Sequence, residues 1–134
     1  MALSYSTTAR NAMLDTLTTA VGPSGKLRIY SGTRPANVAA AITGTLLAEL
    51  ICNASQFALG ASGAVLTLSA ITQDSSNDAT GTASHFRIWK SDGTTAVIDG
   101  TVSTSGSDLN LNTTSIVASG TTSVTSFTIT EGNP

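Results

Sequence analysis

Charged and aromatic residues are scarce in this sequence of 134 residues. Only 10% of the residues are charged and 4% are aromatic, and the formal net charge at pH 7 is −2. Globular domains usually contain about 25% charged residues. The six lysines and arginines are scattered along the chain, whereas a phosphate-binding surface needs them clustered. The sequence therefore argues against nucleic acid as a direct partner.

Cysteine and histidine each occur once, as Cys52 and His85. A single cysteine forms no intramolecular disulfide, and these two residues do not supply the three or four ligands of a zinc site. The sequence also has no glycine-rich phosphate-binding motif and no nucleophile elbow. We therefore predict no catalytic residues, no cofactor and no metal site, and we expect Cys52 to be a small buried apolar residue.

Long apolar runs and an N-terminal signal sequence are missing as well. No stretch approaches the 18 apolar residues of a membrane span. The first basic residue is Arg10, and Asp15 interrupts the only apolar run that follows it, which is not the pattern of a secretory signal. We therefore expect no membrane partner.

Acidic and amide side chains gather at Asp74, Asn77 and Asp78. The segment has neither the alternating spacing of a calcium-binding loop nor its terminal glutamate. Asx and serine side chains are common in turns because they hydrogen-bond the nearby backbone. We therefore predict a turn here, with a cation site as the alternative.

Serine and threonine take the place of the missing charges. The sequence has 18 serines and 23 threonines, almost a third of the chain. Threonine is β-branched and fits half-exposed strands. A surface with few charges also suits contact with other proteins, because each unpaired buried charge costs several kcal/mol. The composition therefore favours a β domain that binds protein.

One helix is expected over residues 7–21. Ser6 or Thr7 provides an N-cap, and Gly22-Pro23 ends the helix. The residues Ala9, Met13, Leu17 and Val21 recur every four positions and form one apolar face. We expect this face to pack on the core, with a partner-binding helix as the alternative.

After Gly25 the apolar pattern changes to the alternation of strands. The expected strands cover residues 26–30, 46–51, 65–71, 82–90, 95–99, 108–112, 116–117 and 123–131. Asp92-Gly93, between two alternating runs, predicts a hairpin. Short strands at this spacing predict a mainly β fold: an antiparallel β-sandwich, jelly-roll-like, over residues 26–131, preceded by one N-terminal helix in a single domain of residues 1–134.

Five segments together carry a resemblance to known proteins: Met1–Thr7, the helix Ala9–Val21, Gly25–Pro35, Gly106–Ile116 and Val124–Glu131. They resemble a group of small virion proteins of tailed bacteriophages, most of all capsid decoration (cement) proteins. The resemblance implies a non-enzymatic protein that is made in the host cytoplasm and binds the outer surface of the phage head. There it would bridge neighbouring capsomers, with the major capsid protein and further copies of itself, as a dimer or trimer, as partners.

We expect contact residues of two kinds: aromatic residues on the polar faces of strands, and residues of loops and chain ends. We select Tyr5, Tyr30, Arg34, Trp89 and Glu131, from the N-terminal segment 2–6, the strands, the loop 31–41 and the C-terminal tail. Core packing is the alternative for Trp89. Two other functions stay open: a tail, fibre or baseplate component, and a carbohydrate-binding adhesin module that uses Trp89 and Tyr30.

Overall fold

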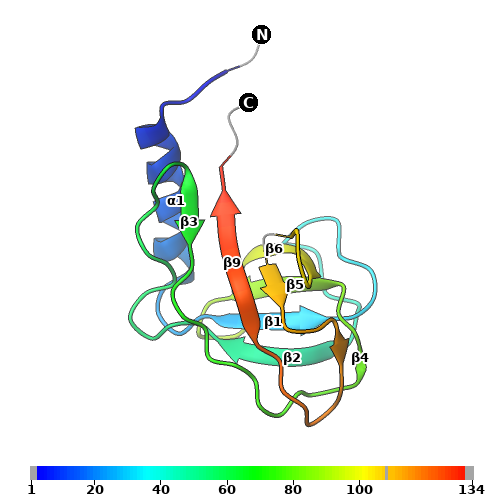
Figure 1. Ribbon diagram of the computed structural model, residues 1–134. Helices are drawn as coiled ribbons and strands as arrows, with labels where there is room; N and C mark the ends of the chain where they lie inside the picture. The colour runs from blue at the N-terminus through cyan, green and yellow to red at the C-terminus, as the bar shows by residue number, and fades with distance from the viewer. Residues whose placement is uncertain (1–2, 108, 132–134) are drawn as a thin grey trace.

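The computed structural model describes residues 3–107 and 109–131, and its fold is mainly β (Figure 1). Its elements are α1 (Thr7–Val21), β1 (Lys26–Tyr30), β2 (Leu46–Ile51), β3 (Val65–Thr67), β4 (Gly81–Thr82), β5 (His85–Trp89), β6 (Ala96–Ser103), β7 (Leu109–Leu111), β8 (Ser115–Ile116) and β9 (Val124–Thr130). Seven strands form one curled sheet in the order β2-β1-β5-β6-β7-β9-β3, and β4 pairs with β8. These pairs are antiparallel except for β6–β7. The predicted class, β-sandwich-like with one N-terminal helix, is confirmed.

The bounds of α1 are those that the sequence predicts. The Ser6 Oγ accepts a hydrogen bond from the Ala9 N–H at 3.1 Å, which satisfies one unpaired amide of the first turn. Gly22 ends the helix at a φ of 73°, where an L side chain would be strained, and its N–H donates to the Thr18 carbonyl. Within residues 3–107 and 109–131, no helix has the length and hydropathy that a membrane span requires.

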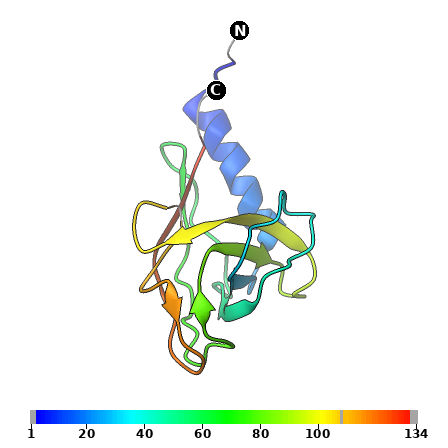
Figure 2. The ribbon, with the colours of Figure 1, turned by 90° about the vertical axis from the view of Figure 1, so that its right-hand side faces the viewer.

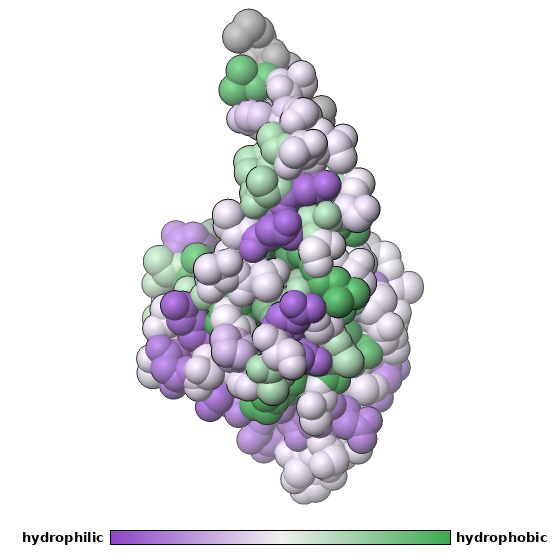
Figure 3. Space-filling view, turned by 90° about the vertical axis from the view of Figure 1, so that its left-hand side faces the viewer, coloured by the Kyte–Doolittle hydropathy of each residue, from purple (hydrophilic) through white to green (hydrophobic). Residues whose placement is uncertain are grey.

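The buried face of α1 differs from the predicted one. Leu14 and Val21 are buried and Leu17 is partly buried, but Met13 is 38% exposed. The end of the molecule where α1 begins in Figure 1 stands out from the rounded body in Figure 3. The buried stripe runs through positions 14, 17 and 21, and the first half of α1 meets the ends of β3 and β9 through Asn11 and Arg10. The prediction of Met13 as a core residue was therefore wrong.

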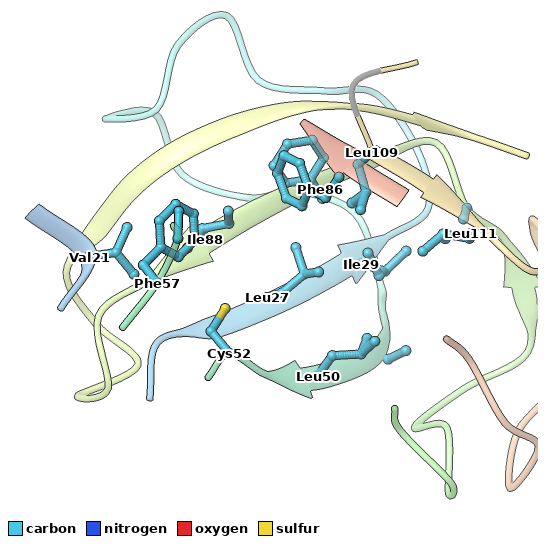
Figure 4. Packing of buried hydrophobic residues seen from close by; sticks show 14 of the residues in the cluster. Val21, Leu27, Ile29, Leu50, Cys52, Phe57, Phe86, Ile88, Leu109 and Leu111 are labelled. Atoms are coloured by element: carbon cyan, nitrogen blue, oxygen red, sulfur yellow. The ribbon is translucent and has the colours of Figure 1, made fainter. Parts of the chain in front are cut away.

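The core lies on the inner, concave side of the sheet (Figure 4). Antiparallel register places Leu27 opposite Ile88 and Ile29 opposite Phe86, and all four side chains are buried. Since side chains alternate along a strand, the residues between them on β1 and β5 face outward. This alternation creates a second, polar face on the same two strands, and the candidate site lies there.

The predicted hairpin joins β5 to β6. Asp92 accepts hydrogen bonds through Oδ1 from the N–H groups of Thr94 and Thr95, and Gly93 has a φ of 70°. The return strand continues past Gly100, where an added Cβ would lie 2.8 Å from the ring of Phe86. The resulting register sets Arg87 opposite Asp99.

The Asp74 region is a turn. The Asp74 carboxylate accepts from the N–H of Ser76 at 2.9 Å and from the N–H of Glu49 at 3.0 Å. The Asn77 side chain donates to the Val117 carbonyl at 3.1 Å. Among the residues that the structure describes, no group of three or more histidine, cysteine or acidic side chains is placed to hold a metal. The predicted turn is confirmed.

Cys52 is 2% exposed, as predicted, and burial raises the pKa of its thiol to about 12. We expect the thiol to react with a disulfide reagent at pH 8 at least about a hundredfold more slowly in the folded protein than after unfolding, because the thiolate is the reactive form. The matched control is Ser55→Cys, at an exposed position of the following loop, which should react at once. Equal rates at the two positions would contradict this placement of Cys52.

Candidate functional site

The outward face of β1 and β5 carries most of the polar and aromatic residues that stand out in the sequence. Lys26 pairs with Trp89, Arg28 with Arg87, and Tyr30 with His85. Directly opposed residues of antiparallel strands project from the same face of the sheet. The pairing therefore gathers cations and rings that lie about 60 residues apart in the sequence.

Arg87 is the most buried charged residue on this face. Its side chain is 2% exposed, and its Nη2 lies 3.2 Å from Oδ2 of Asp99, whose side chain is 5% exposed. Arg34 reaches the other oxygen, Oδ1, at 2.7 Å. Burial raises the pKa of the Asp99 carboxyl, but the hydrogen bonds from the two arginines outweigh burial and hold that pKa below its usual 3.8. One carboxylate thus joins two cations.

Arg87 also holds a loop over the sheet. Its Nη1 donates to the Ala40 carbonyl at 2.7 Å, and its Nη2 donates to the Asn37 carbonyl at 3.1 Å. We call residues 36–42 the lid; the loop that contains it lies in front of β5 and β6 (Figure 2). At the base of this loop the Ser31 N–H donates to the Thr45 carbonyl. The lid is therefore fastened to the sheet by a buried charged residue.

A cavity of about 520 Å³ lies between the lid and the sheet. Its walls are residues 38–42 of the lid together with Tyr30, Arg87, Trp89, Thr94 and Ala96. The lid contributes only small or aliphatic side chains, and the sheet contributes the two aromatic rings. This combination suits an apolar or aromatic group that needs few hydrogen bonds.

Trp89 is held in place from three sides. The guanidinium carbons of Arg28 and Arg87 lie 5.5 and 5.6 Å from the centre of its ring, within the range of cation–π attraction. Its Nε1 donates to the Tyr30 hydroxyl at 3.3 Å. The side chain is half-buried, so part of the indole remains accessible. A fixed aromatic ring loses little conformational entropy when it contacts a partner.

His85 lies at the end of this row and is completely buried. Its ring stacks on Tyr30 with the centroids 5.4 Å apart, and its Nδ1 lies 2.8 Å from the Ser84 Oγ. Burial and the nearby Arg87 lower the pKa of His85 below its usual 6.5. The histidine is therefore neutral at pH 7, and its surroundings resist protonation.

This lowered pKa predicts that acid destabilises the fold. Below pH 6.5 the unfolded chain binds a proton at His85 that the folded chain does not bind, so the free energy of unfolding falls by up to about 1.4 kcal/mol per pH unit. Thermal unfolding between pH 7.5 and pH 5 measures the decrease. His85→Phe, which keeps a ring of similar size, should flatten the profile. If His85→Phe lost as much stability in acid as wild type, His85 would not be the cause of that loss. Asp78 is not its cause either, because its raised pKa stabilises the folded protein as the pH falls.

The structure brings three of the five predicted contact residues together. Tyr30 and Trp89 line the cavity, although Tyr30 is only 5% exposed, and Arg34 is joined to Arg87 through Asp99. Tyr5 precedes α1, and Glu131 follows β9, where its carbonyl accepts from Arg10 of α1. These two residues therefore lie at the N-terminal end of α1, apart from the cavity. Ala2 and the tail 132–134, also predicted as contacts, lie outside the described residues.

The sequence-based selection missed Arg87 and Asp99 as members of the site. A signal for the pair was present, because a hairpin centred on Asp92-Gly93 places residues 87 and 99 opposite each other. The carbonyls of Asn37 and Ala40 carried no such signal, because main-chain acceptors are common to all residues.

A scan against models of known protein families and searches of curated proteins and of solved structures found no match to this chain. The face offers a fixed tryptophan and tyrosine, arginines with paired charges and an apolar lid, a combination typical of the energetic centres of protein interfaces.

Proposed function

We propose that this protein is a non-enzymatic structural component of a tailed-phage virion that decorates the outer surface of the head. In this proposal it binds the major capsid protein and bridges neighbouring capsomers, opposing the outward pressure of packaged DNA. The lid face is the docking surface. The resemblance of the chain's segments to phage virion proteins supports the location on the head, and the observation that carries the docking surface is Trp89 beside a cavity bordered by the lid.

Trp, Tyr and Arg are the residues most enriched at the centres of protein interfaces. The main energetic obstacle to docking a charged face is the desolvation of unpaired charges. Here Arg28 is already bonded to Glu49 at 2.7 Å, and Arg34 and Arg87 share Asp99. Contact with a capsid surface would therefore leave these arginines paired. Many copies of a modest contact add up to strong retention on a shell.

The proposal is tested with particles of the encoding phage that lack this protein. We expect them to release DNA at a lower temperature than complete particles, and we expect added wild-type protein to restore heat resistance. Trp89→Ala should bind the particles at least about tenfold more weakly, as interface tryptophans do. The matched control is Leu59→Ala, which removes an exposed apolar side chain that does not line the cavity and should bind normally.

Particles with unchanged heat resistance after removal of the protein would refute decoration as its role. A cryo-EM reconstruction separates the head from the tail, and density on the tail, fibre or baseplate would establish that alternative. Equal binding by the Trp89 and Leu59 variants would leave the head location intact but refute the lid face as the docking surface.

Carbohydrate binding is the second candidate function, because the half-buried ring of Trp89 lines a cavity and aromatic rings stack on sugar faces. Trp89 is the only tryptophan of the chain, so its fluorescence reports directly on the cavity. A saturable change of fluorescence during titration with mono- and oligosaccharides, absent in Tyr30→Ala, would support this function. If the fluorescence does not change with added sugar and the protein binds phage particles, decoration is favoured.

A further inference from the structure

Another cavity, of about 340 Å³, lies between β6, β9 and the C-terminal half of α1. β6 contributes residues 97–101, β9 contributes Phe127 and Ile129, and α1 contributes Leu17. The ring of Phe86, labelled in Figure 4, completes the wall and packs edge-to-face on Phe127, with the ring centroids 5.3 Å apart. This cavity shares no lining residue with the one under the lid.

The side chains around this cavity are mainly apolar. Phe86 and Phe127 are buried, whereas Leu17, Val97 and Ile129 are only partly buried and pack against the core around them. Apolar side chains that gather around an opening are a feature of binding sites. Because the volume is at the lower end of the range of ligand pockets, the cavity suits one compact apolar group rather than a large ligand.

The main chain of Asp99 faces away from β5. The Val102 N–H donates to the Ser84 carbonyl, on the side of β5, and Asp99 pairs with Arg87. The register shift of the β5–β6 pair lies before Ile98, so the pairing is regular from there to Val102. The main-chain groups of an antiparallel strand alternate between its two sides. The N–H and C=O of Asp99 therefore point to the side where the cavity lies.

Asp99 borders the cavity through its main chain, because its carboxylate is bound by two arginines on the lid side of the sheet. On the side of β6 away from β5, β7 pairs only with Val102 and Ser103. Within the described part of the chain, no strand pairs with Asp99 on that side. One donor and one acceptor of the same residue therefore lie beside an apolar cavity without a strand partner.

An extended peptide matches this arrangement. In a hydrogen-bonded pair of antiparallel strands, two opposed residues exchange both of their N–H···O=C bonds. A peptide residue opposite Asp99 would make these two bonds, and the next residue would lie opposite Gly100. There its side chain would meet the ring of Phe86, which already lies against Gly100. Main-chain bonds to a strand edge together with a side-chain pocket are a known mode of peptide recognition.

We propose that this cavity binds an extended segment of another protein, which pairs with β6 at Asp99 and inserts an uncharged apolar side chain against Phe86 and Phe127. The inserted side chain is uncharged because the only charged group among the lining residues, the Asp99 carboxylate, is already paired on the other face. A charged side chain in the cavity would lose hydration without gaining a partner. The inference does not depend on the proposed phage function, because it uses a different face of the sheet.

A peptide titration followed by NMR tests the site. Acetyl-Leu-Thr-Leu-amide, added to ¹⁵N-labelled protein, should shift the amide signals of Asp99 and its neighbours with a dissociation constant of about 1 mM. The matched peptide carries an N-methyl group on its threonine, which removes the N–H that the Asp99 carbonyl would accept. It should bind at least about tenfold more weakly. Equal affinity of the two peptides, or no saturable shift at Asp99 up to about 10 mM peptide, overturns the proposal.

Two variants of the protein locate the bound peptide. Val97→Phe enlarges a partly buried side chain of the cavity wall and should weaken binding at least about tenfold. The matched control is Val117→Phe, at a 59% exposed position outside the cavity, which should bind normally. Equal binding by the two variants overturns the proposal. A wild-type dimer that Val97→Phe dissociates would assign the cavity to a second copy and would also overturn it.

Hydrogen exchange tests the free main chain of Asp99 without any variant. In the free protein its amide hydrogen should exchange at least about tenfold faster than that of Gly100, which faces β5, and bound peptide should slow it. Equal protection of the two amides in the free protein would show that the Asp99 N–H already has a partner, and this result would overturn the proposal.

Discussion

Replacing Asp99 by alanine should destabilise the protein by about 3–5 kcal/mol, the cost of leaving a buried partner charge uncompensated. The stranded charge is Arg87, which is 2% exposed and which also fixes the lid through the carbonyls of Asn37 and Ala40. Urea unfolding followed by circular dichroism measures the loss. Arg34→Ala is the matched control, because Arg34 bonds the same carboxylate but is 44% exposed, and its loss should cost less than about 1 kcal/mol.

The pH dependence of this difference identifies its cause. The pKa of Asp99 is lower in the folded protein than the ordinary 3.8, so the ionised carboxylate stabilises the fold above that pH. This contribution is lost as the pH falls through the folded pKa. The difference in the free energy of unfolding between wild type and Asp99→Ala should therefore be largest at pH 6 and become smaller below pH 4. A gap that is the same at pH 6 and pH 3 would show that packing, not charge, explains the loss.

Replacing Gly44 by alanine should open the base of the lid. A Cβ on Gly44 would overlap the carbonyl oxygen of Ser31, a main-chain atom that cannot move aside as a flexible side chain does. Ser31 also donates to Thr45 at this point, so the clash falls on the bond that closes the loop. We expect Gly44→Ala to lower the free energy of unfolding by about 3 kcal/mol, at the upper end of the cost of overpacking.

Trp89 fluorescence should change in the same variant, because residues 38–42 of the lid share the cavity with the indole. Gly60→Ala is the matched control, since an added Cβ there meets no atom within 4 Å and Gly60 lies outside the cavity. That variant should keep both the stability and the fluorescence of wild type. A stable Gly44→Ala protein with unchanged fluorescence would contradict the close contact at the loop base.

The elements that the sequence predicted well depend on neighbours in the chain. The cap of α1 at Ser6 and its end at Gly22 each involve residues within four positions. The turn at Asp92-Gly93 likewise closes within its own residues. Met13 shows where this reasoning stops, because helical periodicity did not decide whether position 13 or the adjacent position 14 faces the sheet.

The candidate site also combines residues that local patterns predict with residues that only the fold brings together. Alternation along β1 and β5 already placed Tyr30 and Trp89 on polar strand faces, and those two residues do line the cavity. The partners that complete the site come from elsewhere: the Ala40 carbonyl lies 47 residues from Arg87, and Trp89 reaches Tyr30 across 59 residues. No local pattern encodes such pairs, because they form only when distant strands are brought into register.

The sequence by itself determined a threonine-rich, weakly charged β protein with one capped helix and a central hairpin, because capping, turn chemistry and alternation act over a few residues. Only the tertiary structure decided that Arg87 is buried against Asp99 and that residues 38–42 of the lid border the same cavity as Trp89. The physical reason is the curl of the sheet, which sets distant segments together or apart according to how the whole core packs.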